Sequence, residues 1–409
     1  MLPKTYVASD HDIDPSKIDV DALRILNRLH DAGFTAYIVG GGVRDLLLQH
    51  IPKDFDISTS ARPEEIKRLF GRQCILIGKR FRLAHIRFGR KVFEVSTFRS
   101  GDNEDNLIIR DNQWGSPEED VLRRDFTING LFYDPITHSV IDYVGGWDDI
   151  HKKLLRAIGD PLIRFRQDPV RMIRLLKFRA RFGFDVDTSA RDALIACRKE
   201  IIKSAPARIL EEILRMLESG SSARFIHLMQ QSGMLQLIFP KLSRYLQEGH
   251  EDKTLELLSV ADALNQNSEQ GATDRSILTS LLLYPILNKK IEELEREKGQ
   301  TCHMGDVIFL TNGLIQEIMM TSFIHFPKRM SALISYILST QMRLHVKSGK
   351  QHFRLRMLKN RDFPLALKLF QIRALANKNL FDEYIHWQKL HQTHELQHKK
   401  TRSAPRRHP

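Results

Sequence analysis

Cysteine and long apolar runs are scarce in this chain of 409 residues, and acidic residues are fewer than basic ones. The three cysteines, Cys74, Cys197 and Cys302, are odd in number and far apart, so they argue against a disulfide framework and for reduced thiols in the cytoplasm. No apolar run is long enough to cross a bilayer, and the N-terminal stretch MLPKTYVASDHDID lacks the hydrophobic segment of a secretory signal. We therefore expect a cytoplasmic protein with no membrane segment.

Several common ligand-binding patterns are also missing from the sequence. No Cys/His spacing is typical of a zinc site. The glycines at 40–42 are not followed by the Gly-Lys-Ser/Thr of a Walker loop, and they do not form a GxGxxG fingerprint. No internal repeat is visible.

The excess of basic over acidic residues gives the chain a large positive charge. Lysine and arginine number 63 against 50 aspartates and glutamates, which gives a net charge of +13 and a pI of about 9.6. Such an excess indicates a polyanionic partner, either nucleic acid or an acidic membrane surface. The length predicts more than one domain, and a hydrophobic content of 42% suffices for ordinary cores.

The pattern of residues divides the chain into five parts. A polar leader at 1–19 precedes a head at 20–150, in which helical and strand patterns alternate. A helical neck at 151–245 and a helical body at 246–394 follow, without further convincing strands. The tail at 395–409 carries five Lys/Arg after its last acid and is predicted to be disordered. The fold class is therefore α+β, with a small mixed β-sheet in the head and all-α neck and body domains.

Within the head, two aspartates stand two residues apart in DFDIST. Side chains at i and i+2 of a strand point to the same side, so Asp54 and Asp56 are predicted to share a face. Two carboxylates held together repel each other, and a divalent cation relieves that repulsion. Mg²⁺ prefers oxygen ligands and often binds substrate phosphates as well. An exposed polar strand is the alternative interpretation of this pattern.

The residues about a dozen positions earlier favour the metal interpretation. Backbone N–H groups at Gly41 and Gly42 can approach a triphosphate closely, and Arg44 can pair with phosphate oxygens. Asp45 is expected to orient Arg44 or to cap the chain locally.

The whole stretch GGGVRDLLLQHIPKDFDIST resembles the signature of class II nucleotidyltransferases of the polymerase-beta superfamily, the group that holds bacterial poly(A) polymerases and CCA-adding enzymes. The resemblance covers about residues 20–245. It implies that the glycines and Arg44 hold a triphosphate, and that Asp54 and Asp56 bind Mg²⁺, with Mn²⁺ as an alternative ion. It also implies a two-metal transfer that releases pyrophosphate.

A second stretch, RRDFTINGLFYD, begins at Arg123 and is similar to another motif of this family. We expect a helix that starts at Ser116, on which Asp125 and Asn129 share a face. A capped amphipathic helix without a catalytic role is the alternative. The resemblance implies that Arg124 borders the sugar and phosphates, and that Asp125 joins the catalytic acids. Glu94, on a predicted strand, is a second candidate for the third carboxylate.

A third stretch, RQDPVRMIR, resembles the base-reading motif of the family, in which Asp and Arg pair with the edge of the incoming base. Asp168 and Arg171 carry over, whereas Gln167 replaces the usual Glu. Arg174 continues the same row along a predicted helix. It lies away from the apolar stripe there, so a solvated basic face is the alternative to a nucleotide contact.

The stretch LIGKRFRLAHIRFG at 76–89 is similar to the signature of poly(A) polymerases, and a basic β-hairpin is its alternative interpretation. The sequence therefore predicts a monomeric enzyme that adds AMP from ATP to RNA 3′ ends. A CCA-adding enzyme and an RNA-binding protein with an inactive head are the alternatives. A fused HD-type phosphohydrolase is rejected, because no His is followed directly by Asp behind the head.

Overall fold

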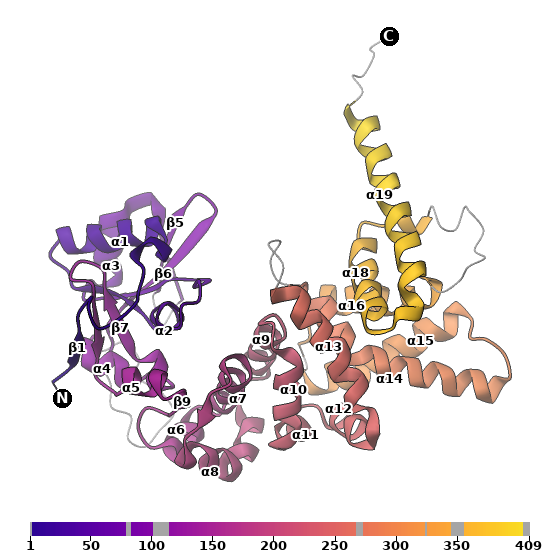
Figure 1. Ribbon diagram of the computed structural model, residues 1–409, viewed down its shortest axis with the longest axis horizontal. Helices are drawn as coiled ribbons and strands as arrows, with labels where there is room; N and C mark the ends of the chain where they lie inside the picture. Colours follow the sequence, from indigo (N-terminus) through magenta and orange to yellow (C-terminus); the bar gives the residue numbers. More distant parts are fainter. Residues whose placement is uncertain are drawn as a thin grey trace. The chain divides into compact units, whose positions relative to one another are not determined.

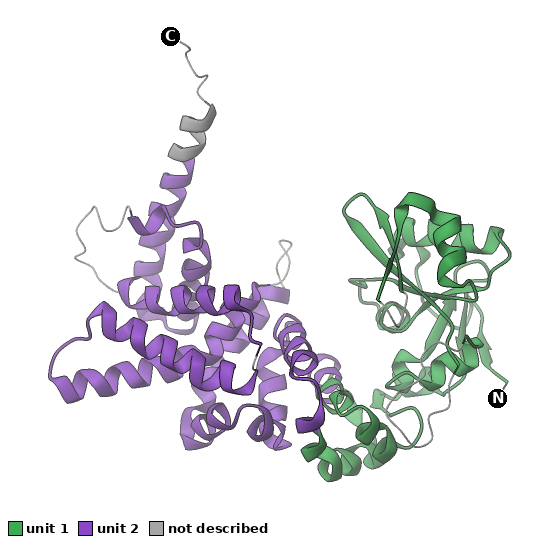
Figure 2. Ribbon diagram, turned by 180° about the vertical axis from the view of Figure 1, so that it is seen from behind, with its two compact units in different colours: residues 1–175, 183–200 green, residues 176–182, 201–409 purple. Residues whose placement is uncertain are grey.

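The structure is a computed structural model that describes residues 2–78, 83–100, 114–266, 273–323, 325–344 and 356–403. The chain forms two compact units, coloured separately in Figure 2. Unit 1 comprises residues 1–175 and 183–200, and unit 2 comprises residues 176–182 and 201–409. The four domain boundaries expected from the sequence stay predictions.

An eight-stranded mixed sheet forms the centre of unit 1 (Figure 1). Its spatial order is β1-β8-β7-β2-β3-β6-β5-β4, in which β3 and β6 run parallel and the other neighbours run antiparallel. The strands are β1 (Lys4–Tyr6), β2 (Ala36–Val39), β3 (Asp56–Thr59), β4 (Cys74–Ile77), β5 (Leu83–Phe88), β6 (Lys91–Thr97), β7 (Leu131–Asp134) and β8 (Ser139–Asp142). The predicted α+β class and mixed sheet are confirmed.

Short helices join and cover these strands. Helix α1 shows why they form where they do: Asp19 caps its first turn by accepting from the Asp21 amide, and Ile25, Leu26 and Leu29 bury one face. The helices of unit 1 are α1 (Val20–Asp31), α2 (Gly41–Leu47), α3 (Pro63–Phe70), α4 (Pro117–Leu122), α5 (Gly146–His151), α6 (Pro161–Gln167), the start of α7 (Val170–Phe182) and α8 (Thr188–Cys197).

Two strands lie beyond residue 150, where the sequence indicated only helices. β9 (Leu154–Leu155) and β10 (Asp185–Val186) form a small parallel pair. Each is two residues long, which is too short for an alternating pattern to show in the sequence. At the other end of the chain, the predicted polar leader contributes the edge strand β1 to the main sheet.

The helix expected to start at Ser116 ends early. α4 stops at Leu122, and Phe126 adopts an extended backbone that bridges Ala157. The Thr127 amide donates to the Arg156 carbonyl at 3.0 Å, so backbone pairing with the segment after β9 replaces helix continuation. Residues Thr127–Asn129 form a single 3₁₀ turn. Tertiary pairing has overridden the local helical pattern here.

Unit 2 is helical throughout its described part. Its helices are the remainder of α7, α9 (Pro206–Leu217), α10 (Ser222–Gln231), α11 (Met234–Ile238), α12 (Pro240–Tyr245), α13 (Glu251–Gln266), α14 (Arg275–Lys298), α15 (Met304–Ile315), α16 (Lys328–Leu344), α18 (Phe363–Ala376) and α19 (Phe381–Ser403). Phe363, Phe370 and Trp387 lie in a buried cluster that joins α18 to α19.

Helix α19 changes the expectation for the C-terminal tail. The helix runs to Ser403, so residues 395–403 are helical where disorder was predicted. Leucine, glutamate, glutamine and lysine in this stretch favour a helix, which explains its continuation. Residues 404–409 lie outside the described residues, as do Lys79, Arg80 and Phe81 of the predicted signature.

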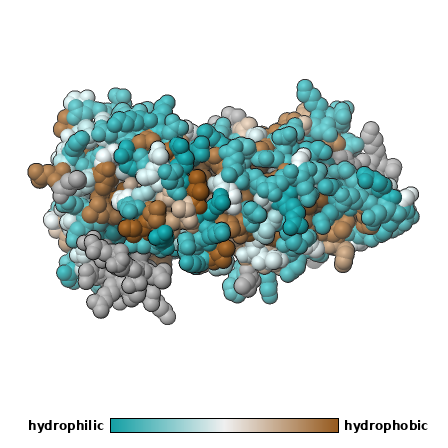
Figure 3. All heavy atoms as spheres, turned by 90° about the horizontal axis from the view of Figure 1, so that it is seen from below, coloured by the Kyte–Doolittle hydropathy of each residue, from teal (hydrophilic) through white to brown (hydrophobic). Residues whose placement is uncertain are grey.

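The structure also shows where the exposed apolar side chains and the three cysteines lie. Large exposed apolar side chains are scattered among polar ones, and the face in Figure 3 is mostly hydrophilic. No helix among the described residues has the length and apolar character needed to cross a membrane. All three cysteines are free; Cys74 and Cys197 are buried, and Cys302 is partly so.

Candidate active site

A glycine turn joins β2 to α2 at the centre of the sheet. Gly40 has a φ of 66°, a conformation that favours glycine, and a Cβ there would lie 3.1 Å from Nη1 of Arg124. At Gly42 an added Cβ would meet Ile38 Cγ2 at 3.3 Å and the carbonyl oxygen of Asp54 at 3.5 Å. The sequence analysis assigned the phosphate contacts to Gly41 and Gly42, whereas Gly40, the first of the three glycines, has the positive φ of the turn.

The two predicted metal ligands lie beside this turn. β3 begins at Asp56, which pairs with Val39, the residue directly before the glycines. Asp54 precedes the strand by two residues, in the connection from α2, and not on the strand as predicted. Its carbonyl lies near Gly42, and both aspartates are exposed. The glycine turn and the two aspartates therefore lie at the same end of the paired strands β2 and β3.

Glu94 belongs to the same face of the sheet. Oγ of Ser58 lies 3.0 Å from Oγ of Ser96, so these two side chains share a face of the parallel strands β3 and β6. Asp56 and Glu94 each stand two residues earlier, and strand alternation places them on that face too. The Glu94 side chain is 54% exposed, and its Oε1 lies 3.6 Å from Nε2 of His85.

These carboxylates fit a divalent cation that substrate phosphates also coordinate. Among the residues described by the structure, no three His, Cys, Asp or Glu side chains are grouped closely enough to hold a metal on their own. Mg²⁺ commonly takes one or two protein carboxylates and completes its octahedron with water and phosphate oxygens. Asp54 and Asp56 are exposed oxygen donors of that kind, at the turn where a phosphate has access to backbone N–H groups.

Behind the exposed carboxylates, a buried network surrounds Arg44, which is 3% exposed. Its Nε and Nη2 donate to Oδ1 of Asp45 at 2.9 and 2.7 Å, and its Nη1 donates to Oδ1 of Asn129. Asn129 in turn donates to Oδ1 of Asp125 at 2.9 Å. The predicted role of Asp45 in orienting Arg44 agrees with these contacts. These contacts hold Arg44 on Asp45 and Asn129, and its predicted contact with phosphate stays a prediction.

Asp125 forms the end of this network that adjoins α7. Its Oδ2 lies 3.6 Å from Nη1 of Arg174, and its Oδ1 also accepts from the Phe126 amide at 2.8 Å. Burial alone would raise the pKa of Asp125, but the charges of Arg174 and Arg171 and the hydrogen bonds outweigh it and hold the pKa below its usual value. Asp125 is therefore a carboxylate at neutral pH. Arg174 pairs with it, so it is not simply part of a solvated face.

Arg124 connects the second motif to the sheet. Its Nη2 donates to Oδ2 of Asp120 at 2.9 Å and to Oγ of Ser58 at 3.3 Å, and its guanidinium lies 5.3 Å from the centre of the Phe132 ring. Ser58 lies on the face that carries Asp56, two residues before it, and Gly40 lies against the same guanidinium. The structure therefore brings Arg124 to the glycine turn, as its predicted contact with sugar and phosphate requires.

The predicted base-reading residues lie at the junction of α6 and α7. Asp168 caps the end of α6, because Pro169 disfavours a helical conformation for the residue before it. Arg171 is 8% exposed; its Nε lies 4.0 Å from Oδ2 of Asp168. Its terminal nitrogens donate to the carbonyls of Arg123 and Arg124 at 2.9 and 3.2 Å. Arg171 thus holds the second motif in place as well as adjoining Asp168.

Arg164 is a member of this junction that the sequence analysis missed. Its Nη2 donates to the carbonyls of Leu122 and Arg124, and its Nη1 lies 3.4 Å from Oε1 of Gln167. Burial and the nearby charges of Arg171 and Arg123 lower the pKa of Arg164 to about 10. Arg164 lies four residues, or about one helical turn, before Asp168, and this spacing could have predicted that it adjoins the junction.

Comparison with known proteins identifies the group to which these motifs belong. Residues 36–156 match the family described as "Poly A polymerase head domain", residues 183–259 match "Probable RNA and SrmB- binding site of polymerase A", and residues 315–409 match "Polymerase A arginine-rich C-terminus". Poly(A) polymerase I of Haemophilus influenzae is 36% identical over 383 residues, which cover 90% of this chain and 83% of that protein.

Relatives with a different name match a smaller part of the chain. The CCA-adding enzyme of Bacillus velezensis is 37% identical over 232 residues, which cover 56% of this chain and 58% of that protein. Among solved structures, the Bacillus stearothermophilus CCA-adding enzyme in complex with CTP has a similar fold, with a TM-score of 0.62 at 23% identity over 89% of this chain and 82% of that one. This chain therefore belongs to the class II nucleotidyltransferase family of poly(A) polymerases and CCA-adding enzymes, and it is a nucleotidyltransferase that acts on RNA 3′ ends.

Proposed function

We propose that the enzyme adds AMP from ATP to the 3′ ends of RNA without a template. The observation that carries this proposal is the extent of similarity: 90% of the chain aligns with a poly(A) polymerase, against 56% with a CCA-adding enzyme. The match of residues 315–409 to the arginine-rich C-terminus of polymerase A supports the same choice. The predicted signature at 76–89 supports the same choice.

The exposed carboxylates are the proposed ligands of Mg²⁺, or of Mn²⁺. Asp54 and Asp56 hold the ion, and Asp125 or Glu94 completes the acidic set. Glu94 shares a sheet face with Asp56, whereas Asp125 is an ionised but largely buried partner of Arg174. This geometry favours Glu94 as the ligand and Asp125 as a positioning residue. A bound divalent cation supplies Lewis acidity at the reacting phosphate and at the pyrophosphate leaving group.

The nucleotide contacts are assigned to the residues around the glycine turn and the α6–α7 junction. Backbone N–H groups at Gly41 and Gly42 and the guanidinium of Arg124 bind the triphosphate. Asp168 and Arg171 recognise the adenine edge, and Arg174 keeps Asp125 ionised beside Asn129. Arg44 fixes the turn from behind. We also propose that the enzyme is a monomer and that it is cytoplasmic; its three free thiols support the second of these.

A CCA-adding enzyme is the second candidate, because the CCA-adding enzyme of Bacillus velezensis is 37% identical to this chain over 232 residues. Gln167 replaces the glutamate expected in the base-reading motif, and Nη1 of Arg164 lies 3.4 Å from its Oε1. The loss of that negative charge alters the electrostatic surroundings of the residues assigned to base recognition, and so bears on the choice of ATP over CTP.

Product sequencing tests the proposal. The enzyme is incubated with Mg²⁺, all four NTPs and either a tRNA that lacks CCA or an unrelated oligoribonucleotide. We expect homopolymeric A tails on both RNAs. CCA ends on the tRNA alone would assign the enzyme to the second candidate, and no incorporation into either RNA would leave an RNA-binding protein with an inactive head.

A further inference from the structure

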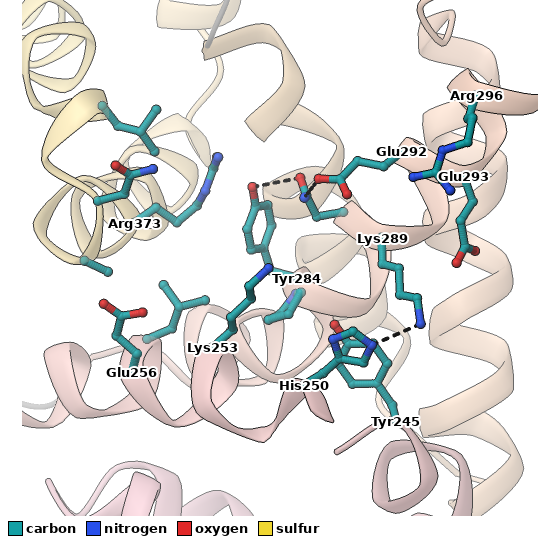
Figure 4. A pocket seen from close by; sticks show the side chains of 16 residues that line it. Tyr245, His250, Lys253, Glu256, Tyr284, Lys289, Glu292, Glu293, Arg296 and Arg373 are labelled. Atoms are coloured by element: carbon teal, nitrogen blue, oxygen red, sulfur yellow. Dashed lines mark hydrogen bonds between the residues drawn. The ribbon is translucent and has the colours of Figure 1, made fainter. Parts of the chain in front are cut away.

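A pocket of about 460 Å³ lies within unit 2, between α13, α14 and α18 (Figure 4). It is built entirely from residues of that unit, and none of the residues assigned above to the nucleotide transfer lines it. Most of its lining comes from α14 and α18, outside the region 183–259 that matches a probable RNA-binding segment. The motifs found in the sequence did not predict it.

Aromatic rings supply the apolar part of the lining. The rings of Tyr245 and His250 stack with centres 4.4 Å apart and an interplanar angle of 14°. Tyr284 is half-buried, the guanidinium of Arg373 lies 4.2 Å from its ring centre, and its hydroxyl donates to Oδ1 of Asn288 at 3.3 Å. Burial and the charges of Glu292 and Glu293 raise the pKa of Tyr245 to about 12, so this phenol stays neutral.

Charges of both signs alternate around these rings. Lys253 and Glu256 come from α13, and Lys289, Glu292 and Arg296 come from α14. Nζ of Lys289 lies 3.0 Å from Nε2 of His250, and Nδ2 of Asn288 donates to Oε1 of Glu292. Cations and carboxylates therefore lie within one pocket, next to π surfaces.

From this combination we propose that the pocket binds one ribonucleotide. A ribonucleotide presents an anionic phosphate, hydroxyl and amino donors, and a flat base, which match the cations, the carboxylates and the rings respectively. Small-molecule pockets of a few hundred Å³ hold ligands of that size. An acidic peptide fits less well, because it offers no flat base to the rings of Tyr245 and Tyr284.

The ribonucleotide has two possible sources with the same chemistry. It is either one residue of an RNA strand or a free nucleotide. The strand source rests on the proposed function, since it requires RNA to be the substrate of the enzyme. In that case the pocket holds a residue upstream of the 3′ end, and base stacking makes the contact tolerant of sequence.

Crosslinking with the full chain tests the pocket directly. Oligoribonucleotides of 20 residues carry one photoreactive base at successive distances from the 3′ end, and they are irradiated with the enzyme without ATP. We expect crosslinks within peptides that contain residues 245–257 or 284–296. In a parallel arm, radiolabelled AMP is bound by equilibrium dialysis without RNA; AMP binding without an RNA crosslink assigns the pocket to a free nucleotide.

Adjacent lysines on α14 provide a matched pair of variants. Lys289 lines the pocket, whereas Lys290 does not and lies 3.5 Å from Oε2 of Glu317. Lys289→Ala should weaken binding of the RNA, or of AMP, about fivefold, because one phosphate contact is lost. Lys290→Ala should change this binding less than about twofold, because Lys290 does not line the pocket. Thermal unfolding of both variants checks that the fold is kept.

The outcomes separate this proposal from the proposed function. The proposal is overturned if RNA does not crosslink at the pocket and AMP does not bind there. It is also overturned if Lys289→Ala and Lys290→Ala change nucleotide binding equally. Both conclusions hold even if the enzyme extends RNA with AMP. Binding of a fluorescent oligoglutamate peptide that Lys289→Ala alone abolishes, with no nucleotide bound, would also overturn it in favour of an acidic protein partner. If RNA crosslinks at the pocket but the enzyme adds no AMP, the pocket still binds a ribonucleotide and the proposed polyadenylation is rejected.

Discussion

The exposed carboxylates beside the glycine turn and the buried network behind them use the same residue types in opposite ways. Asp54, Asp56 and Glu94 are exposed, whereas Arg44 and Asp45 are nearly inaccessible and hydrogen-bonded to each other. Exposed carboxylates keep their oxygens available for ions, while buried charges need protein partners to offset their desolvation. Residues that bind ligands and residues that position them should therefore respond differently to mutation.

Removal of an exposed carboxylate should give the largest effect and should act on activity alone. Asp56→Asn or Asp54→Asn should lower AMP incorporation at least about a thousandfold, because a metal-bound transition state loses several kcal/mol of stabilisation. The melting temperature should hold or rise slightly, since the repulsion between like charges is reduced. Incorporation assays and thermal unfolding measure the two quantities, with exposed Asp185→Asn as the control. Ordinary tailing by either variant would remove the metal assignment.

Removal of the buried arginine should mainly lower stability. Arg44→Met leaves Asp45 buried without its ion pair, so the free energy of unfolding should fall by about 3–5 kcal/mol. Arg24→Met removes the exposed partner of Asp21, which keeps Lys91 at 3.5 Å, so it should cost less than about 1 kcal/mol. Urea unfolding compares the two variants. Equal losses would mean that the network around Arg44 does not stabilise the turn.

Arg171 is proposed both to bind the base and to position the second motif. Its replacement should therefore affect activity and stability together. Arg171→Ala should lower the ratio of kcat/KM for ATP over CTP about tenfold, because a site that recognises a base by hydrogen bonds loses discrimination when a donor is removed. It should also lower stability by about 2 kcal/mol, since two backbone carbonyls lose a charged donor. Steady-state kinetics with both nucleotides and urea unfolding give the two numbers. An unchanged preference for ATP would place base choice elsewhere.

The pH dependence of Asp125 should give the smallest effect. Its folded pKa lies below the ordinary value of about 3.9, so its contribution to stability is complete above that pH and is lost as the pH falls through the folded pKa. Asp125→Asn should cost about 2 kcal/mol between pH 5 and 8. The difference from the wild type should then shrink below about pH 4. Urea unfolding across this range measures it, and a difference that is independent of pH would contradict the pairing with Arg174.

The sequence predicted the exposed carboxylates and glycines of the site better than the buried network around Arg44. Asp54, Asp56 and the glycines are close in sequence, so their spacing and the family signature that it resembles grouped them together. The bond between Arg44 and Asn129 spans 85 positions, and no local pattern records it. The helix expected at Asp125 failed for the same reason, because its backbone pairs with Arg156 and Ala157 from a later segment. The contact between Asp125 and Asn129 was nevertheless anticipated, although a 3₁₀ turn provides it.

The state of the three thiols has a practical consequence for spectroscopy. Cys74 and Cys197 are buried, and burial raises the pKa of the Cys74 and Cys302 thiols, so little reactive thiolate forms near neutral pH. A single cysteine introduced at an exposed position, such as Glu256 at the rim of the pocket, should react with maleimide dyes before the native thiols do. The enzyme should therefore accept a fluorescent reporter of nucleotide binding without prior removal of its own cysteines.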